Sequence, residues 1–209
     1  MKKILTAQEE QNISSVVQNF ERNINAEFVI VINQASDPYP AARLRFSIMA
    51  SILCSSLLTG HTEFIPVAVL ILFIFFYLLS RISFFKRMGL NSTEVIREVR
   101  EKALETYYTQ VLDNLENTRS PAILFYISLF ERKIEIIVSK KILKHLNQKD
   151  LDVAINNLSQ HFKRNEFNNG LLKSIELLEQ KLMAAFPEKI SAEYQDTLDN
   201  EIIWLDSSK

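Results

Sequence analysis

The sequence contains few of the residues on which several common chemistries depend. Its 209 residues include one cysteine, Cys54, and three glycines. A single cysteine excludes a disulfide framework or a cysteine-based metal site within one chain. The glycines, Gly60, Gly89 and Gly170, are too far apart for a phosphate-binding loop or a dinucleotide fingerprint. A net charge of −1 gives no electrostatic basis for nucleic acid as a partner.

Two uncharged apolar runs lie inside the chain. They are Phe46–Leu58 and Ile65–Tyr77, joined by the loop Thr59–Glu63. Crossing a hydrocarbon layer of about 30 Å takes about 20 helical residues, so both runs need their flanks to span it. A pair of buried core helices is the alternative, but the second run is apolar on every face, which favours lipid. We therefore predict a transmembrane helical hairpin with helices at about 46–60 and 64–81.

Cations flank this hairpin at its outer ends. They are Arg43, Arg45, Arg81, Lys86 and Arg87. Their long stems can lie along apolar surface while the charges reach the headgroups. The loop carries only His61 and Glu63, so the positive-inside rule places both polar halves of the chain in the cytoplasm. We expect a multi-pass protein of the cell (inner) membrane, with the lipid bilayer as a partner.

The polar halves predict a small mixed sheet between helices. Three runs are strand-like: Glu27–Asn33, Ala122–Leu129 and Lys133–Val138. The first is apolar from Phe28 to Ile32, which is typical of a strand covered on both faces. Helix starts are indicated by the pairs Thr6 with Glu9, Asn91 with Glu94, and Asn147 with Asp150, and a last helix is expected over 170–186.

The expected fold class is α/β, an α/β/α sandwich in which a small mixed β-sheet is flanked by helices and interrupted by a two-helix transmembrane hairpin. Residues 1–40 and 90–187 are expected to form the two parts of the domain, and 41–89 the hairpin. Residues 188–209 form an acidic tail that we expect to be mobile.

Six segments share their order and spacing with a known family. They are Ala26–Ile32, Ser36–Tyr39, Thr118–Ser128, Glu131–Ile137, Phe167–Leu172 and Phe186–Pro187. In this order, with a membrane hairpin in the first gap, they resemble the membrane-bound branch of the TPM domain family from about Leu5 to Pro187. The resemblance implies a small sheet between helices.

For function, the resemblance implies phosphatase activity, divalent metal binding in loops at one end of the sheet, or assembly and maintenance roles beside membrane complexes. The chain departs from its relatives after the third strand, where Ser139, Lys140 and Lys141 stand in place of an acidic residue. Ammonium groups repel a divalent ion. The site is therefore weak, or lost, or the lysines meet an anionic partner.

The remaining oxygen donors for calcium or magnesium are Glu27, Asp37 and Thr118, with Asp150 or Asp152 as further donors. Each has an ordinary structural role as well. Glu27 is a carboxylate at a strand edge, Asp37 stabilises a turn beside Pro38, and Thr118 ends a helix. No cofactor is certain from the sequence, and a divalent cation stays an alternative.

Two charged regions are candidate contact surfaces. Lys140, Lys141 and Lys144 form a basic cluster that is either solvated or in contact with anionic lipid headgroups. In the acidic tail, Ile203, Trp204 and Leu205 are apolar. They dock either on the domain itself or on a partner.

Hypotheses of different classes remain. We favour an integral membrane protein whose TPM-like domain is a non-catalytic interaction or accessory module for a membrane-protein partner, because the chain lacks the expected acid and a nucleophile paired with a base. The alternative is a divalent-metal-dependent phosphatase with a weak or lost site. A third hypothesis is a homo-oligomer assembled through small residues of the first run, Ala50, Ser51, Ser55 and Ser56.

Overall fold

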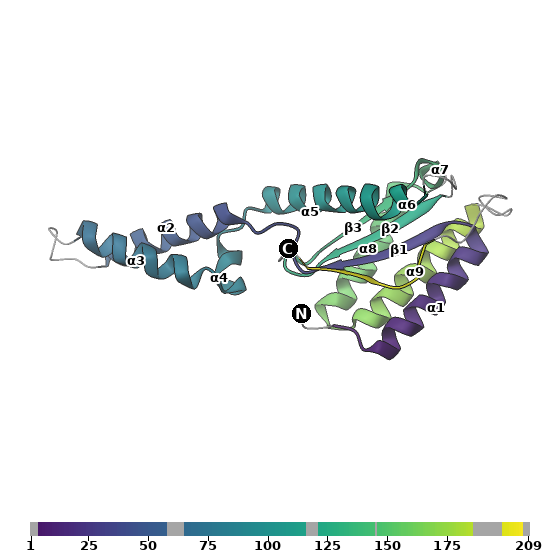
Figure 1. Cartoon of the computed structure of the whole chain (residues 1–209), viewed down its shortest axis with the longest axis horizontal. Helices are drawn as coiled ribbons and strands as arrows, with labels where there is room; N and C mark the ends of the chain where they lie inside the picture. The colour runs from purple at the N-terminus through teal and green to yellow at the C-terminus, as the bar shows by residue number, and fades with distance from the viewer. Residues whose placement is uncertain (1–3, 58–64, 116–120, 145, 186–197, 207–209) are drawn as a thin grey trace. The chain divides into compact units, whose positions relative to one another are not determined.

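The computed structural model describes residues 4–57, 65–115, 121–144, 146–185 and 198–206. They form two compact units, of which unit 1 combines residues 1–36 with 99–209 and unit 2 consists of residues 37–98. The sheet belongs to unit 1 and a helical hairpin to unit 2, and one helix, α5 (Ser92–Thr106), begins in unit 2 and continues into unit 1 (Figure 1). The unit boundaries fall at 36/37 and 98/99, whereas the sequence suggested 40/41 and 89/90.

Within the described residues, unit 1 contains a four-stranded mixed sheet of order β3-β2-β1-β4. The strands are β1 (Glu27–Asn33), β2 (Ala122–Ser128), β3 (Lys133–Val138) and β4 (Ile203–Leu205). β1 pairs in parallel with both β2 and β4, and β2 pairs antiparallel with β3. The register places Glu27 opposite Ala122 and Asn33 opposite Ser128. The carboxyl ends of β1 and β2 therefore meet at one edge of the sheet.

Helices cover both faces of this sheet (Figure 1). α1 (Ala7–Ile24), α8 (Gln148–Lys163) and α9 (Phe167–Ala185) share a core with alternate residues of the central strands, including Phe28, Ile30 and Phe125. The opposite face is covered by α5 (Ser92–Thr106), which continues through a π-helical segment (Tyr107–Leu112) into α6 (Asp113–Leu115). Because both faces are covered, every residue of β1 and β2 is buried, as parallel strands require.

Local sequence signals determine where the helices begin. At the start of α1, the Thr6 hydroxyl accepts from the Glu9 amide, and the Glu9 carboxylate accepts from the Thr6 amide at 2.8 Å. Asn147 and Asp150 make the same reciprocal pair at the start of α8. Each pair satisfies amides that have no partner inside the helix. Two of the three predicted helix starts are thus confirmed as capping boxes, and at the third Asn91 precedes α5 (Ser92–Thr106), where its Oδ1 accepts from the Thr93 amide at 3.0 Å.

Unit 2 contains α2 (Pro40–Ser56), α3 (Ile65–Leu79) and the short helix α4 (Ser83–Met88). α2 packs against α3 and against α4. At a rise of 1.5 Å per residue, the 17 residues of α2 and the 15 of α3 extend about 25 Å and 22 Å. Among the described residues, no helix is both long enough and apolar enough to span a membrane.

The α/β part of the predicted fold is thus confirmed, as is a helical hairpin between the first two strands. The transmembrane part is not supported, because no described helix is both long enough and apolar enough to span a membrane. Three short elements were not predicted. α4 is six residues long, α7 (Lys140–Leu143) four and β4 three, and each is too short for a periodic pattern to show.

Phe28 is a suitable probe of the core. It is 1% exposed, and its ring lies 4.8 Å from the rings of both Phe20 and Phe125. Phe28→Ala removes these contacts and leaves a cavity, so we expect the free energy of unfolding to fall by about 3–5 kcal/mol. Urea denaturation of the full chain measures the change. The matched control is Phe84→Ala, at a side chain that is 68% exposed. Equal effects of the two variants would contradict this description of the core.

Burial of Tyr107 predicts a loss of stability in alkali. Removal from water raises the pKa of Tyr107 to about 12, and the neighbouring Tyr108 adds to the shift. An unfolded tyrosine ionises near pH 10, so this contribution to stability is complete below about pH 10 and is lost as the pH rises to about 12. Urea denaturation at a series of pH values should show a shallower alkaline decline in Tyr107→Phe than in the wild type. Parallel declines in the two would show that Tyr107 is not the cause.

Candidate functional site

The hairpin of unit 2 has small polar side chains inside. Ser47, Ser51 and Ser55 follow one another at every fourth position of α2 and are buried. Each hydroxyl donates to a carbonyl of its own helix, Ser47 to Arg43 at 2.7 Å, Ser51 to Ile48 and Ser55 to Ile52 at 2.9 Å. These donors are therefore satisfied without water. Small residues at this spacing let two helices approach closely, as in helix pairs within membranes.

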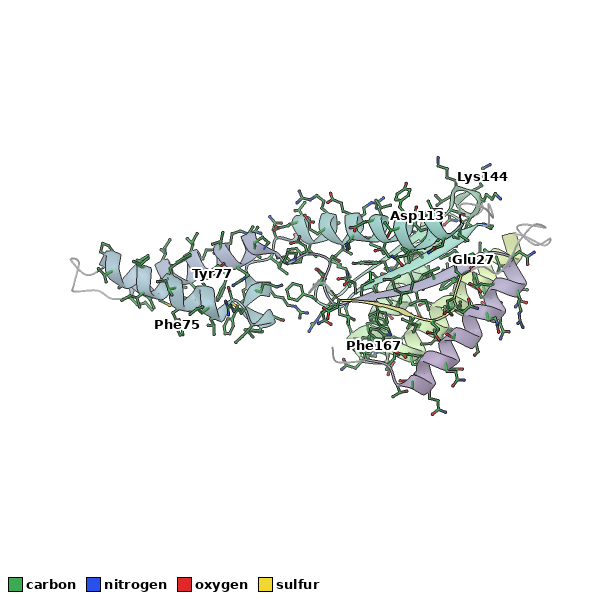
Figure 2. All side chains as sticks on the ribbon, in the orientation of Figure 1. Glu27, Phe75, Tyr77, Asp113, Lys144 and Phe167 are labelled. Atoms are coloured by element: carbon green, nitrogen blue, oxygen red, sulfur yellow. The ribbon has the colours of Figure 1, made fainter. Side chains whose placement is uncertain are left out.

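Large apolar side chains cover the outside of the same hairpin (Figure 2). On α2, Met49 is 71% exposed and Leu53 is 67% exposed. On α3, Leu70, Ile71, Ile74, Phe75 and Leu78 are all more than half exposed. A hairpin that is stable in water places its apolar side chains inside. The arrangement here is the reverse, and contiguous apolar surface of this kind marks a site of contact with lipid or protein.

Cations gather where the hairpin begins and ends. The Arg43 guanidinium lies 4.6 Å from the centre of the Tyr77 ring, and its Nε donates to Ser80 Oγ at 3.3 Å. Arg45 forms an ion pair with Glu94. Lys86 Nζ donates to the Pro38 carbonyl at 3.4 Å. No charged residue lies between Phe46 and Leu57 or between Ile65 and Leu79. The hairpin thus has an apolar body and a charged base.

A second polar arrangement lies in unit 1, at the carboxyl ends of β1 and β2. Asn33 Nδ2 donates to Tyr126 Oη at 2.7 Å. Ser36 Oγ donates to Ser128 Oγ at 3.0 Å, and Ser128 Oγ donates to the Glu131 carboxylate. Because the single hydroxyl hydrogen of Ser36 is used in this way, the 3.1 Å contact between Tyr126 Oη and Ser36 Oγ has Tyr126 as donor. All donors of this hydroxyl chain therefore point toward Glu131.

The hydroxyl chain holds the segment through which the main chain leaves unit 1. Glu131 also accepts from the Ser36 amide at 2.9 Å, and Ser36 is the last residue of unit 1 before unit 2. Burial raises the pKa of Tyr126, although its hydrogen bonds to Ser36 and Asn33 oppose the shift. The phenol is therefore neutral and able to donate. Asn33 and Ser128 are each 1% exposed. We therefore interpret the hydroxyl chain as structural support.

The structure does not bring the predicted metal ligands together. Glu27 is buried at the start of β1, whereas Asp37 follows Ser36 beyond the other end of that strand. A seven-residue strand separates its ends by about 20 Å. Thr118 lies outside the described residues. In the part of the chain that the structure describes, no group of three or more histidine, cysteine or acidic residues is placed to hold a metal ion. The metal site stays a prediction.

Ser139 and the basic cluster lie at the Glu27 end of the sheet. The Ser139 amide donates to the Ala122 carbonyl at 2.9 Å, and Ala122 is opposite Glu27. Lys140 and Lys141 begin α7 (Lys140–Leu143), and their side chains are exposed, as is that of Lys144 (Figure 2). The cluster is thus at the end of the sheet opposite Ser36. Contact of these lysines with lipid stays a prediction.

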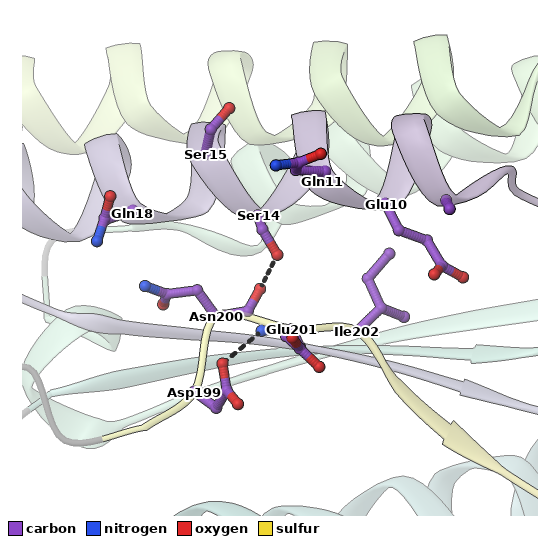
Figure 3. A pocket seen from close by; sticks show the side chains of 10 residues that line it. Glu10, Gln11, Ser14, Ser15, Gln18, Asp199, Asn200, Glu201 and Ile202 are labelled. Carbon is purple, nitrogen blue, oxygen red and sulfur yellow. Dashed lines mark hydrogen bonds between the residues drawn. The ribbon is translucent and has the colours of Figure 1, made fainter.

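The apolar group of the tail docks on unit 1. Ile203, Trp204 and Leu205 form β4 beside Val31, Ile32 and Asn33 of β1. Trp204 Nε1 donates to Glu10 Oε1 at 3.0 Å, and Ser14 Oγ donates to the Asn200 carbonyl at 2.7 Å (Figure 3). A groove of about 610 Å³ lies between α1 and residues 199–202. The expected mobile tail therefore contains an ordered part, 198–206, that pairs within the chain.

Comparison with known proteins identifies a domain family in part of the chain and a solved structure with a similar fold. A family model described as the TPM domain matches residues 93–181. The chain contains a TPM domain. The NMR structure of the BA42 protein from the psychrophilic bacterium Bizionia argentinensis has a TM-score of 0.59 and 17% sequence identity, covering 98% of this chain and 97% of that chain. At this identity the likeness shows the fold alone. Comparison with curated proteins gives no match, and neither finding supports the membrane-bound branch.

Only some features of these sites could be predicted from the sequence. The apolar runs predicted the hairpin, but its inverted arrangement depends on which faces of α2 and α3 meet. The hydroxyl chain was missed, because Asn33 is 93 residues from Tyr126 and Ser36 is 95 residues from Glu131. The two segments converge only through the parallel register of β1 and β2. Ser36 and Glu131 did fall within the segments that resemble the TPM family.

Removal of one hydroxyl tests the hydroxyl chain. Tyr126→Phe leaves the Asn33 amide without its acceptor and Ser36 without its donor, so we expect the free energy of unfolding of the TPM domain to fall by about 1–3 kcal/mol. Urea denaturation of the full chain measures the loss. The control is Tyr108→Phe, at a side chain that is 59% exposed. A loss no larger than that of the control would show that the hydroxyl chain contributes nothing to stability.

Proposed function

We propose that this protein is a membrane-associated accessory protein. Its α2–α3 hairpin enters a lipid bilayer, and its TPM domain is a non-catalytic module that contacts a membrane-protein partner. The observation that carries the proposal is the inverted hairpin, with Ser47, Ser51 and Ser55 inside and large apolar side chains outside.

Physical chemistry favours lipid over water around this surface. Each exposed leucine, isoleucine or phenylalanine transferred from water to an apolar environment gains about 1.5–3 kcal/mol. The buried serines do not oppose insertion, because their hydroxyls already donate to carbonyls of α2 and leave no donor unsatisfied in hydrocarbon. Arg43, Arg45, Arg81, Lys86 and Arg87 are placed at the base, where charges reach the headgroups.

The hairpin topology determines what remains outside the bilayer. α2 and α3 are shorter than the roughly 30 Å of a hydrocarbon core, and both the entry at Asp37 and the exit after Leu79 are at the base. Because the entry and the exit are at the same end of the hairpin, both parts of unit 1 are on one side. We propose the cytoplasmic side, from the cations at the base.

A vesicle flotation assay with the full chain tests the proposal. We expect the wild type to float with phosphatidylcholine vesicles. The double variant Ile71→Asp, Ile74→Asp should lose this binding, because each charge in hydrocarbon costs about 3 kcal/mol, or roughly a hundredfold in partitioning. Both side chains are more than half exposed, so their replacement leaves the α2–α3 interface intact.

The matched control carries the same change on unit 1, Leu104→Asp with Val153→Asp, at side chains that are 37% and 52% exposed. It should float like the wild type. A wild-type chain that stays in solution, or equal loss in both double variants, would contradict membrane entry. Hydrolysis of p-nitrophenyl phosphate that depends on added calcium or magnesium would contradict the non-catalytic assignment and restore the phosphatase alternative.

A further inference from the structure

The segment that follows α3 combines exposed apolar side chains with cations. In and beside α4, Ile82 is 53% exposed, Phe84 68% and Met88 65%. Arg81, Lys86 and Arg87 lie among them in sequence. A short helix with bulky apolar side chains and basic residues is suited to the boundary between headgroups and acyl chains, where the apolar groups enter and the cations meet phosphates.

α4 is held in a defined place at the base of the hairpin. Gly89 ends the helix, and a Cβ at this position would lie 1.9 Å from the carbonyl oxygen of Ala42 in α2. Only glycine permits this approach of the two backbones. Lys86 is further positioned over the Tyr39 ring, 5.9 Å from its centre, and beside the Pro38 carbonyl. The cations of α4 are therefore at the depth where α2 begins.

Basic residues outnumber acidic residues in unit 2. Glu94 forms an ion pair with Arg45, and Glu98 accepts from Arg97 at 2.7 Å. Among the described residues 37–57 and 65–98 there are six arginines and lysines against three acidic residues. The unit thus has an excess of positive charge, and none of that charge lies on α3 or on the half of α2 that follows Phe46.

From this geometry we infer that α4 is a binding surface for anionic phospholipid headgroups, with Arg81, Lys86 and Arg87 at the phosphates and Ile82, Phe84 and Met88 between the acyl chains. This inference rests on the proposed function, because it needs the hairpin to be in a bilayer. The lipid class that the base of the hairpin selects is anionic phospholipid. Exposed cations near an anionic surface strengthen binding by about fivefold each.

Flotation of the full chain with two kinds of vesicle tests the inference. One kind is phosphatidylcholine alone, and the other is phosphatidylcholine mixed with phosphatidylglycerol. We expect the wild type to bind the mixed vesicles more strongly by about tenfold or more, with the difference reduced by added salt. The triple variant Arg81→Gln, Lys86→Gln, Arg87→Gln should bind both kinds equally. Arg81→Gln alone, at an exposed side chain, should lose about fivefold on mixed vesicles only.

The matched control removes the same charge from unit 1, in Lys140→Gln, Lys141→Gln, Lys144→Gln. This variant should keep the preference for phosphatidylglycerol. Loss of the preference in the α7 variant but not in the α4 variants would overturn the inference and assign lipid recognition to α7. Equal wild-type binding to both vesicles would overturn the inference and leave the proposed function standing. Absence of binding to either would contradict the proposed function itself.

Discussion

The parallel pairing of β1 with β2 is the constraint on which the rest of the structure depends. Both strands are buried at all seven positions, and Glu27 to Asn33 pair with Ala122 to Ser128 without a break. Parallel neighbours cannot be joined by a tight turn, so the chain must return along the sheet before β2 begins. α5, the π-helical segment and α6 make this return and cover one face. The connection therefore has to be long, and it can contain an insertion without breaking the strand pairing.

Unit 2 is that insertion. The chain leaves unit 1 after Ser36, where the hydroxyl chain from Asn33 to Glu131 fixes the exit, and re-enters it at Val99 within α5. The two units bury different kinds of residue. Unit 1 places its apolar residues between helices and sheet, as a domain in water does. The hairpin buries Ser47, Ser51 and Ser55 together with Phe46 and leaves most of its large apolar side chains exposed. A single chain thus combines a domain with a filled apolar core and a hairpin with a large exposed apolar surface.

The sequence predicted those parts of the fold that depend on neighbours along the chain. The strand β1, the capping boxes at Thr6 and Asn147 and the two apolar helices all follow from local patterns. It did not predict β4, whose three residues are held by Trp204 on Glu10 and by pairing to Val31, because these contacts are between distant residues. The candidate metal ligands Glu27 and Asp37 came from the family resemblance and their oxygen donors; Glu27 begins β1 and Asp37 follows Ser36 after its other end, and the metal site stays a prediction. The two apolar helices, α2 and α3, are 17 and 15 residues long, and no described helix is both long enough and apolar enough to span a bilayer.

The most direct test of the account is the environment of Cys54 in the presence of lipid. It is the only cysteine of the chain and lies near the end of α2 that is remote from the base, so a nitrobenzoxadiazole fluorophore attached to it reports on the hairpin without any mutation. If the hairpin enters lipid, the emission shifts to the blue when vesicles are added, and nitroxides on the acyl chains quench it more strongly than nitroxides on the headgroups. An emission that vesicles leave unchanged, with no quenching from the acyl chains, would show that the hairpin does not enter lipid and would contradict the central claim.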